Sequence, residues 1–232
     1  MSIQVFPQKF EMKIDTILDL EIQELKNMGI DEIGYYKWTS INYGVYSTAY
    51  LFWSKDKSTF IQKFEDSEYD KNPVIKFKPI EINDSAFFNF YKLHKNKLKK
   101  ENVEHFKSKP DSIVGNIIHS SRVTISHSSY RNFVIKTDNE NFHKYFDYFD
   151  LKEFDKKKVY ASKRDYTKEE IKKWEERGWE GMKTKIIHEN YPLRNINYEL
   201  NKELKLVEWE KIMKKFIEEF ESENKFELLK SE

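Results

Sequence analysis

The chain has 232 residues, with 41 lysines and arginines against 40 aspartates and glutamates, no cysteine and only six glycines. The absence of cysteine excludes disulfide bonds, thiolate metal sites and cysteine nucleophiles, and the balance of charge excludes a long-range field that would draw the whole chain to a polyanion. Aromatic residues make up 16% of the chain, which excludes a disordered polar polypeptide and predicts an aromatic-rich core.

The first part of the sequence predicts one helix followed by a β-meander. Apolar side chains recur at helical spacing from Ile14 to Met28 and stop at Gly29, which is typical of a helix C-terminus. From Ile33 onward aromatic and β-branched residues predominate, and a polar turn over 55–58 separates two such runs. The expected strands are 35–38, 46–53, 59–64 and 75–78, with the clearest hairpin over 46–65.

A second helix and a basic segment follow. Asp84 or Ser85 can cap a helix whose apolar face holds Phe87, Tyr91, His94 and Leu98. The segment 92–109 contains seven lysines against two glutamates, but it lacks the arginines and interleaved aromatic residues that are typical of nucleic-acid readers. We therefore interpret it as a solvated helix end and expect no nucleic-acid partner.

The second half of the sequence predicts a hairpin and three helices. Strands are expected at 113–119, 122–126 and 132–137, with 127–131 as the turn between the last two, and further strands at 183–188 and 195–200. The expected helices are an aromatic-faced helix over 142–149, a helix that begins at the capping-box spacing Thr167-x-x-Glu170, and a long C-terminal helix over 209–220.

These elements predict an α+β fold with mainly antiparallel sheets, built from β-hairpins packed with amphipathic helices, because strands and helices do not alternate as in βαβ units. We expect a single domain over 1–232, within which two subdomains, 1–109 and 110–232, are an alternative because the composition changes at 108–112. The chain has no apolar run of 18 residues and no apolar core of a secretory signal near its start, so we expect a soluble cytoplasmic protein without membrane insertion.

Most motifs of catalytic and cofactor-binding sites are missing from the sequence. The six scattered glycines cannot form a phosphate-binding loop, and no GxSxG, HExxH or EF-hand motif occurs. The six histidines have no tight ligand spacing, so we predict neither a bound metal nor a cofactor.

One cluster of residues keeps a catalytic alternative open. His119 and His127, with Ser129 and Arg131, could supply the general base, the general acid and the anion clamp of a metal-independent RNA-cleaving enzyme or phosphodiesterase. On one uninterrupted strand, however, the two histidines would lie about 27 Å apart. We therefore interpret these residues as turn and strand-end residues and keep catalysis as the second hypothesis.

Rings and carboxylates alternate at the end of the predicted helix over 142–149. Asp147, Tyr148 and Asp150 are expected to face outward there, and Phe154 and Asp155 follow. Such a surface suits a basic protein partner, because aromatic side chains contribute affinity and carboxylates steer the encounter. Our preferred hypothesis is a non-catalytic protein that binds another protein, such as an immunity protein that masks a basic bacterial toxin. The plain alternative is an ordinary helix end and loop.

Overall fold

The structure is a computed structural model of the chain. It describes residues 13–41, 44–67, 74–83, 85–110, 112–114, 117–119, 128–155, 159–165, 167–177, 184–190, 193–223 and 225–229. The helices are α1 (Lys13–Asn27), α2 (Ala86–Lys100), α3 (Lys168–Glu175), α4 (Tyr198–Lys202), α5 (Lys205–Ser222) and the 3-10 helix η1 (Tyr148–Leu151). The strands are β1 (Ile33–Ile41), β2 (Val45–Lys55), β3 (Ser58–Ser67), β4 (Ile75–Lys76), β5 (Ile80–Ile82), β6 (Ser112–Val114), β7 (Ile117–His119), β8 (Ser129–Thr137), β9 (Glu140–Asp147), β10 (Phe154–Asp155), β11 (Val159–Asp165), β12 (Thr184–Asn190) and β13 (Leu193–Arg194).

The chain forms two compact units, and the first is not continuous in sequence. It comprises Met1–His105, Thr124–Leu151 and Asn197–Glu232, and the second unit comprises Phe106–Val123 and Lys152–Ile196. These units differ from the subdomains 1–109 and 110–232 considered above. The reason is strand pairing: β8, from the second half of the sequence, is hydrogen-bonded to β1 from the first half.

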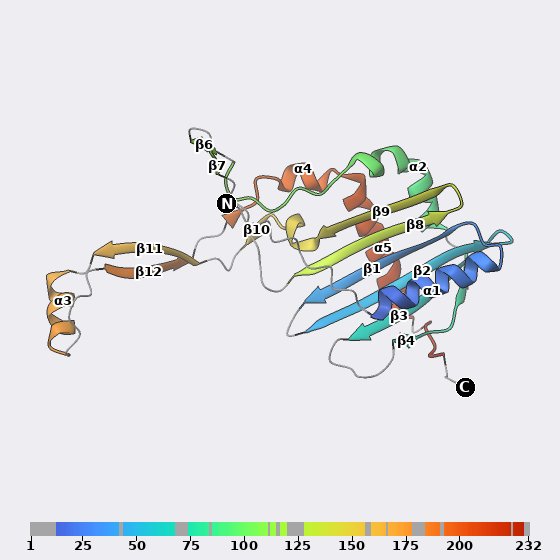
Figure 1. Ribbon diagram of the computed structural model, residues 1–232, viewed down its shortest axis with the longest axis horizontal. Coiled ribbons are helices and arrows are strands. Elements are labelled where there is room, and N and C mark those ends of the chain that lie inside the picture. Colours follow the sequence, from blue (N-terminus) through green and yellow to red (C-terminus); the bar gives the residue numbers. More distant parts are fainter. Residues whose placement is uncertain are drawn as a thin grey trace. The chain divides into compact units, whose positions relative to one another are not determined.

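The first unit is built on a seven-stranded antiparallel sheet, which confirms the expected α+β class. The strand order is β4-β3-β2-β1-β8-β9, and β5 also pairs with β3 (Figure 1). The register places Tyr36 of β1 opposite Tyr50 of β2 and Phe133 of β8. Opposite residues share one face of an antiparallel sheet, so these three rings lie in one row.

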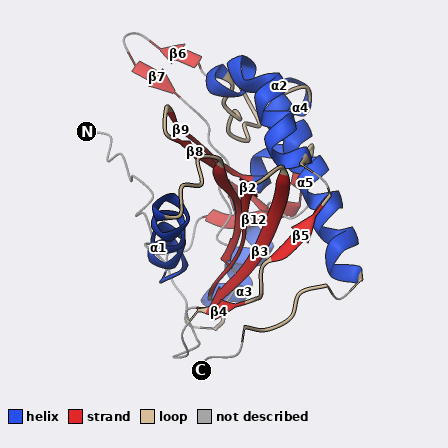
Figure 2. Cartoon of the chain, turned by 90° about the vertical axis from the view of Figure 1, so that its right-hand side faces the viewer, coloured by secondary structure: helices blue, strands red, loops and turns tan. Residues whose placement is uncertain are grey.

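Helices cover both faces of this sheet, with α1 on one side and α2 and α5 on the other (Figure 2). The α1 face buries the apolar stripe that the sequence predicts, with Ile14, Leu18, Ile22 and Leu25 packed in one cluster with β-strand residues such as Leu51 and Phe64. The opposite face is centred on the fully buried Trp209 of α5, whose ring centroid lies 4.5 Å from that of Phe133 and 5.1 Å from that of Phe87. Large rings account for much of this core, as the composition predicts.

Local signals in the sequence explain how several elements begin and end. Gly29 follows α1 with a φ of 77°, a left-handed conformation that glycine adopts without steric cost. In α3 the predicted capping box is formed: the Thr167 backbone N–H donates to Glu170 Oε2 at 3.1 Å, and the Glu170 N–H donates to Thr167 Oγ1 at 3.2 Å. The predicted C-terminal helix is confirmed as α5.

The aromatic-faced helix predicted over 142–149 is wrong, because this segment forms strand β9 followed by η1. Phe142 and Phe146 are four residues apart, and that spacing places two side chains on one face of a strand as well as of a helix. Pairing with β8 decides between the two, since β9 joins it through the two-residue turn at 138–139.

Two further expectations are wrong in detail. The predicted turn over 127–131 does not include 129–131, which belong to β8, and the strand expected at 195–200 is replaced in part by α4. The strand expected at 122–126 lies outside the described residues. No helix in the described part of the chain is long and apolar enough to cross a membrane.

The second unit consists of small two-stranded sheets and helix α3. The pairs are β6 with β7, β10 with β13 and β11 with β12, all antiparallel. Within this unit, the buried Asn195 binds two neighbouring backbone segments: its backbone N–H donates to the Glu153 carbonyl at 2.8 Å, and its side-chain oxygen accepts from the Lys107 N–H at 3.3 Å.

Candidate functional site: an aromatic surface over a buried ion pair

A buried ion pair joins the sheet to helix α5. Arg131 Nε of β8 lies 3.1 Å from Glu210 Oε1 of α5, and the two side chains are only 6% and 2% exposed. A second guanidinium nitrogen of Arg131 donates to Ser129 Oγ at 2.6 Å and to the Tyr130 carbonyl at 3.3 Å. Arg131 therefore has several fixed hydrogen-bond acceptors, as a buried guanidinium requires.

Two aromatic rings lie against the Arg131 guanidinium. The Arg131 Cζ atom is 4.4 Å from the Tyr148 ring centroid and 5.7 Å from the Trp38 ring centroid. Trp38 lies directly opposite Arg131 in the β1–β8 register, and Tyr148 begins η1 just after β9. Cation–π attraction thus holds one ring from the sheet and one from η1 in place over the same cation.

These rings form part of an exposed surface at one end of the sheet. Trp38 is 44% exposed and Tyr46, on the neighbouring strand β2, is 48% exposed. The register places Tyr46 opposite Ser40, and Ser40 opposite Ser129, so hydroxyl side chains share this face. We call the following set the aromatic surface: Trp38, Tyr46, Tyr148, Ser40, Thr48, Ser129 and Lys214.

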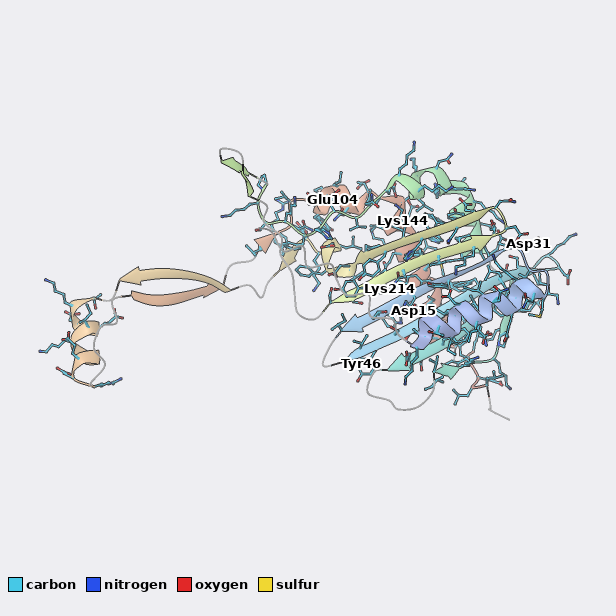
Figure 3. All side chains as sticks on the ribbon, in the orientation of Figure 1. Asp15, Asp31, Tyr46, Glu104, Lys144 and Lys214 are labelled. Atoms are coloured by element: carbon cyan, nitrogen blue, oxygen red, sulfur yellow. The ribbon has the colours of Figure 1, made fainter. Side chains whose placement is uncertain are left out.

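Lys214 of α5 borders the aromatic surface. Its Nζ atom lies 6.0 Å from the Tyr148 ring centroid and 3.8 Å from Glu218 Oε1, one helical turn farther along α5. Tyr46 and Lys214 are labelled in Figure 3, near the end of the sheet where β1 finishes and β2 begins. Burial raises the pKa of Tyr36, which lies one row deeper on this face, while the Arg131 charge acts in the opposite direction.

The predicted partner-binding residues of the first unit do not all face outward. Tyr148 belongs to the aromatic surface, but Asp150 is buried, and its Oδ2 atom lies 3.0 Å from His105 Nδ1. Asp147 accepts hydrogen bonds from the Ser128 hydroxyl and, at 2.8 Å, from the Phe149 backbone N–H. The expectation of outward-facing carboxylates at a helix end is wrong for Asp150, because the segment ends a strand and turns its acids toward nearby donors.

The two remaining predicted partner-binding residues belong to the second unit. Phe154 is exposed and pairs with Arg194 across β10 and β13. The Asp155 backbone pairs with Leu193, and its side chain lies outside the described residues. A binding role for these two residues stays a prediction.

The structure describes the side chains of only two of the four candidate catalytic residues, Ser129 and Arg131. Ser129 and Arg131 are in direct contact, and the Arg131 charge is paired with Glu210. His119 ends β7, where its backbone pairs with Ser112, but its side chain is outside the described residues, as is the whole of His127. In the part of the chain that the structure describes, no group of three histidine, aspartate or glutamate side chains could hold a metal ion.

The basic segment 92–109 has several of its charges paired within the first unit. Lys95 and Lys99 both bind the Glu140 carboxylate at 2.5 Å, and Lys92 lies 2.6 Å from Glu32 Oε1. Burial would raise the pKa of Glu140, but the hydrogen bonds from the two lysines outweigh it and lower the pKa to about 2. This part of the segment therefore stabilises the fold, beyond solvating a helix end.

Sequence reasoning missed Trp38, Tyr46 and Glu210. All three stand in elements that were predicted, but their proximity depends on the pairing of β1 with β8 and on the position of α5 over the sheet. One signal was available: Glu210 interrupts the face of α5 between Trp209 and Met213, where a buried carboxylate requires a cationic partner.

Comparison of the chain with protein-family models, with curated proteins and with solved structures found no match.

Proposed function

We propose that the protein acts by binding another protein through the aromatic surface. The observation that supports the proposal is the exposure of Trp38 and Tyr46, at 44% and 48%, beside Tyr148 on the same end of the sheet. Tryptophan and tyrosine are enriched among the residues that dominate protein–protein affinity, because each buries a large area while losing little conformational entropy. Side chains of this size gain most when a partner covers them.

The surroundings of the rings favour a preformed binding surface. Trp38 and Tyr46 lie on neighbouring strands. Tyr148 lies against the Arg131 guanidinium, which is held in place by its ion pair with Glu210. A partner would therefore order few additional groups on binding, which reduces the entropic cost of association. The mixture of rings and hydroxyl groups is also typical of antibody-like recognition of protein surfaces.

An immunity protein neutralises a toxin by binding and masking the toxin surface. We therefore propose that the partner is a basic bacterial toxin and that the protein has an immunity-type role. The exposed carboxylate of Glu218 and the half-exposed carboxylate of Glu65 stand near the rings, since Glu65 lies opposite Thr48 and Glu218 follows Lys214 on α5. Both carboxylates also pair with lysines of the chain, Glu65 with Lys63 at 2.7 Å and Glu218 with Lys214 at 3.8 Å, so the preference for a basic partner rests on the sequence hypothesis and not on a net negative rim.

The experiment is a quantitative capture of proteins from the source cell with the purified chain as bait. We expect one protein to be retained by the wild-type chain and at least about tenfold less of it by Trp38→Ala or Tyr46→Ala, since aromatic hot-spot residues contribute about 2 kcal/mol or more and about 1.4 kcal/mol already corresponds to tenfold. Tyr145→Ala is a matched control, because Tyr145 is also 48% exposed but points to the opposite face of the sheet. Equal capture by all four proteins would contradict the proposal.

The RNA-cleaving alternative remains a prediction with its own test. A purified chain that degrades RNA, and loses this activity on His119→Ala or His127→Ala, would overturn the binding proposal. Full retention of partner capture by the same two variants, with no RNA cleavage by the wild-type chain, is the result we expect.

A further inference from the structure

The edge of the sheet next to β4 is formed by residues 225–229, which we call the 225–229 segment. Leu228 pairs in antiparallel orientation with Phe77. The Lys78 N–H donates to the Glu227 carbonyl at 2.8 Å, and the Leu229 N–H donates to the Lys76 carbonyl at 3.0 Å. The segment thus adds a single antiparallel bridge to the sheet beyond β4.

Aromatic contacts fix the 225–229 segment to the first unit. The Phe226 ring centroid lies 5.2 Å from that of Phe220, 6.0 Å from that of Tyr50 and 6.1 Å from that of Phe77. Lys63 Nζ lies over both Phe77 and Phe226, at 5.0 and 5.7 Å from their centroids. The contacts of Phe226 therefore hold the 225–229 segment in a fixed position at the edge of the sheet.

The backbone of Leu228 faces away from the sheet. In an antiparallel pair, the residue between two inward-bonded neighbours points its own N–H and C=O outward, and here Glu227 and Leu229 supply the inward bonds. The Leu228 side chain is 59% exposed, and Ile75 and Leu229 are exposed on the same edge. This edge offers one backbone donor, one backbone acceptor and aliphatic side chains.

Among the described residues of this edge, no lysine is left without an acidic partner. Unpaired lysines commonly prevent edge-to-edge association, because their charges repel a second copy. Here each of the three described lysines is paired within the chain: Lys76 with Glu21 at 2.6 Å, Lys78 with Glu227 at 2.7 Å, and Lys225 with Glu223. The described part of the edge is consequently close to neutral and compatible with a copy of itself.

We infer that the 225–229 segment is a self-association site at which a second copy of the chain binds. The two copies are related by a two-fold axis beside Leu228, so that each Leu228 N–H donates to the Leu228 carbonyl of the other copy and the two sheets continue into one. An isologous contact of this kind closes after two copies and does not propagate into a fibre. The contact is small, so the dimer is weak and forms at high concentration.

Sedimentation velocity of the full chain between about 5 and about 500 µM tests this inference. We expect a monomer–dimer equilibrium whose dissociation constant rises at least about tenfold in Leu228→Lys, which places two charges at the axis. Leu228→Pro should have a similar effect, because it removes the outward N–H, which neither inward bond at Glu227 or Leu229 uses. Circular dichroism establishes that each variant is folded.

Leu93→Lys is the matched control, since Leu93 is 78% exposed on α2 and away from this edge. It should dimerise as the wild-type chain does, and so should Trp38→Ala, because the inference does not depend on the proposed function. A wild-type chain that stays monomeric at the highest concentration would overturn the inference. An equal effect of Leu93→Lys and Leu228→Lys would overturn it as well.

Discussion

Removal of the Glu210 charge should strongly destabilise the first unit. In Glu210→Gln the Arg131 guanidinium remains buried between Trp38 and Tyr148 without its counter-charge. Breaking one side of a buried pair costs about 3–5 kcal/mol, because an uncompensated charge stays out of water. Since the free energy of unfolding of a domain is typically about 5–15 kcal/mol, this loss would be a large share of its stability.

Urea unfolding followed by circular dichroism measures this loss directly. A matched control is available on the same helix: Lys214 and Glu218 form an exposed pair at 3.8 Å, and Glu218→Gln should cost less than about 0.5 kcal/mol. The double variant Arg131→Met/Glu210→Leu should recover most of the stability, since a well-packed apolar pair can replace a buried ion pair. A cost below about 1 kcal/mol for Glu210→Gln would show that Arg131 is solvated and that the ion pair does not stabilise the first unit.

Three further predictions concern the stability of the first unit. Asn201→Ala should cost about 3 kcal/mol in urea unfolding, because the buried amide group makes three hydrogen bonds of 2.8, 2.9 and 3.1 Å to backbone groups that would be left unpaired. Burial raises the pKa of the Glu140 carboxyl in the folded state, but the hydrogen bonds from Lys95 and Lys99 outweigh burial and lower this pKa to about 2. Ionised Glu140 should therefore stabilise the fold above its ordinary pKa of 4.5, and this stabilisation should be lost as the pH falls toward 2. The contribution is about 1–2 kcal/mol after solvent screening, and it would be contradicted if wild type and Glu140→Gln differed equally at pH 7 and pH 2.5. Gly34→Ala should lower the free energy of unfolding by at least about 2 kcal/mol and with it the thermal unfolding temperature, since the new Cβ would lie 2.6 Å from a backbone oxygen and under 3 Å from two core side chains. An unchanged unfolding temperature would show that the strands can move apart to accept the methyl group.

The sequence predicts the elements whose pattern has one structural interpretation. The stripe of α5 from Trp209 to Phe220 fits a helix alone, and the stripe of α1 ends at a glycine with a left-handed backbone. The capping box at Thr167 is likewise local, because its two hydrogen bonds lie within four residues. Such features depend on neighbours in the chain and can be read without the fold.

Features that depend on pairing between elements, whether neighbouring or distant in the chain, could not be predicted in this way. Phe142 and Phe146 fit a helix and a strand equally, and only their pairing with β8 makes this segment a strand. Arg131 was assigned to a turn and to a catalytic alternative, whereas its role is set by Glu210, which is 79 residues away. Three residues of the candidate site, Ser129, Arg131 and Tyr148, are predicted from the sequence under two different hypotheses, and the fold brings them together.

Site-specific photo-cross-linking in the source cell is the most direct test of the proposal that the aromatic surface binds a protein partner. A benzophenone amino acid at position 46 replaces the Tyr46 ring by another aromatic ring, leaves Trp38 and Tyr148 intact and places the reactive group within the aromatic surface. We expect a discrete cross-linked protein from position 46 and none from position 145, on the opposite face of the sheet. The absence of any cross-linked protein from position 46, or the same product from both positions, would contradict the proposal.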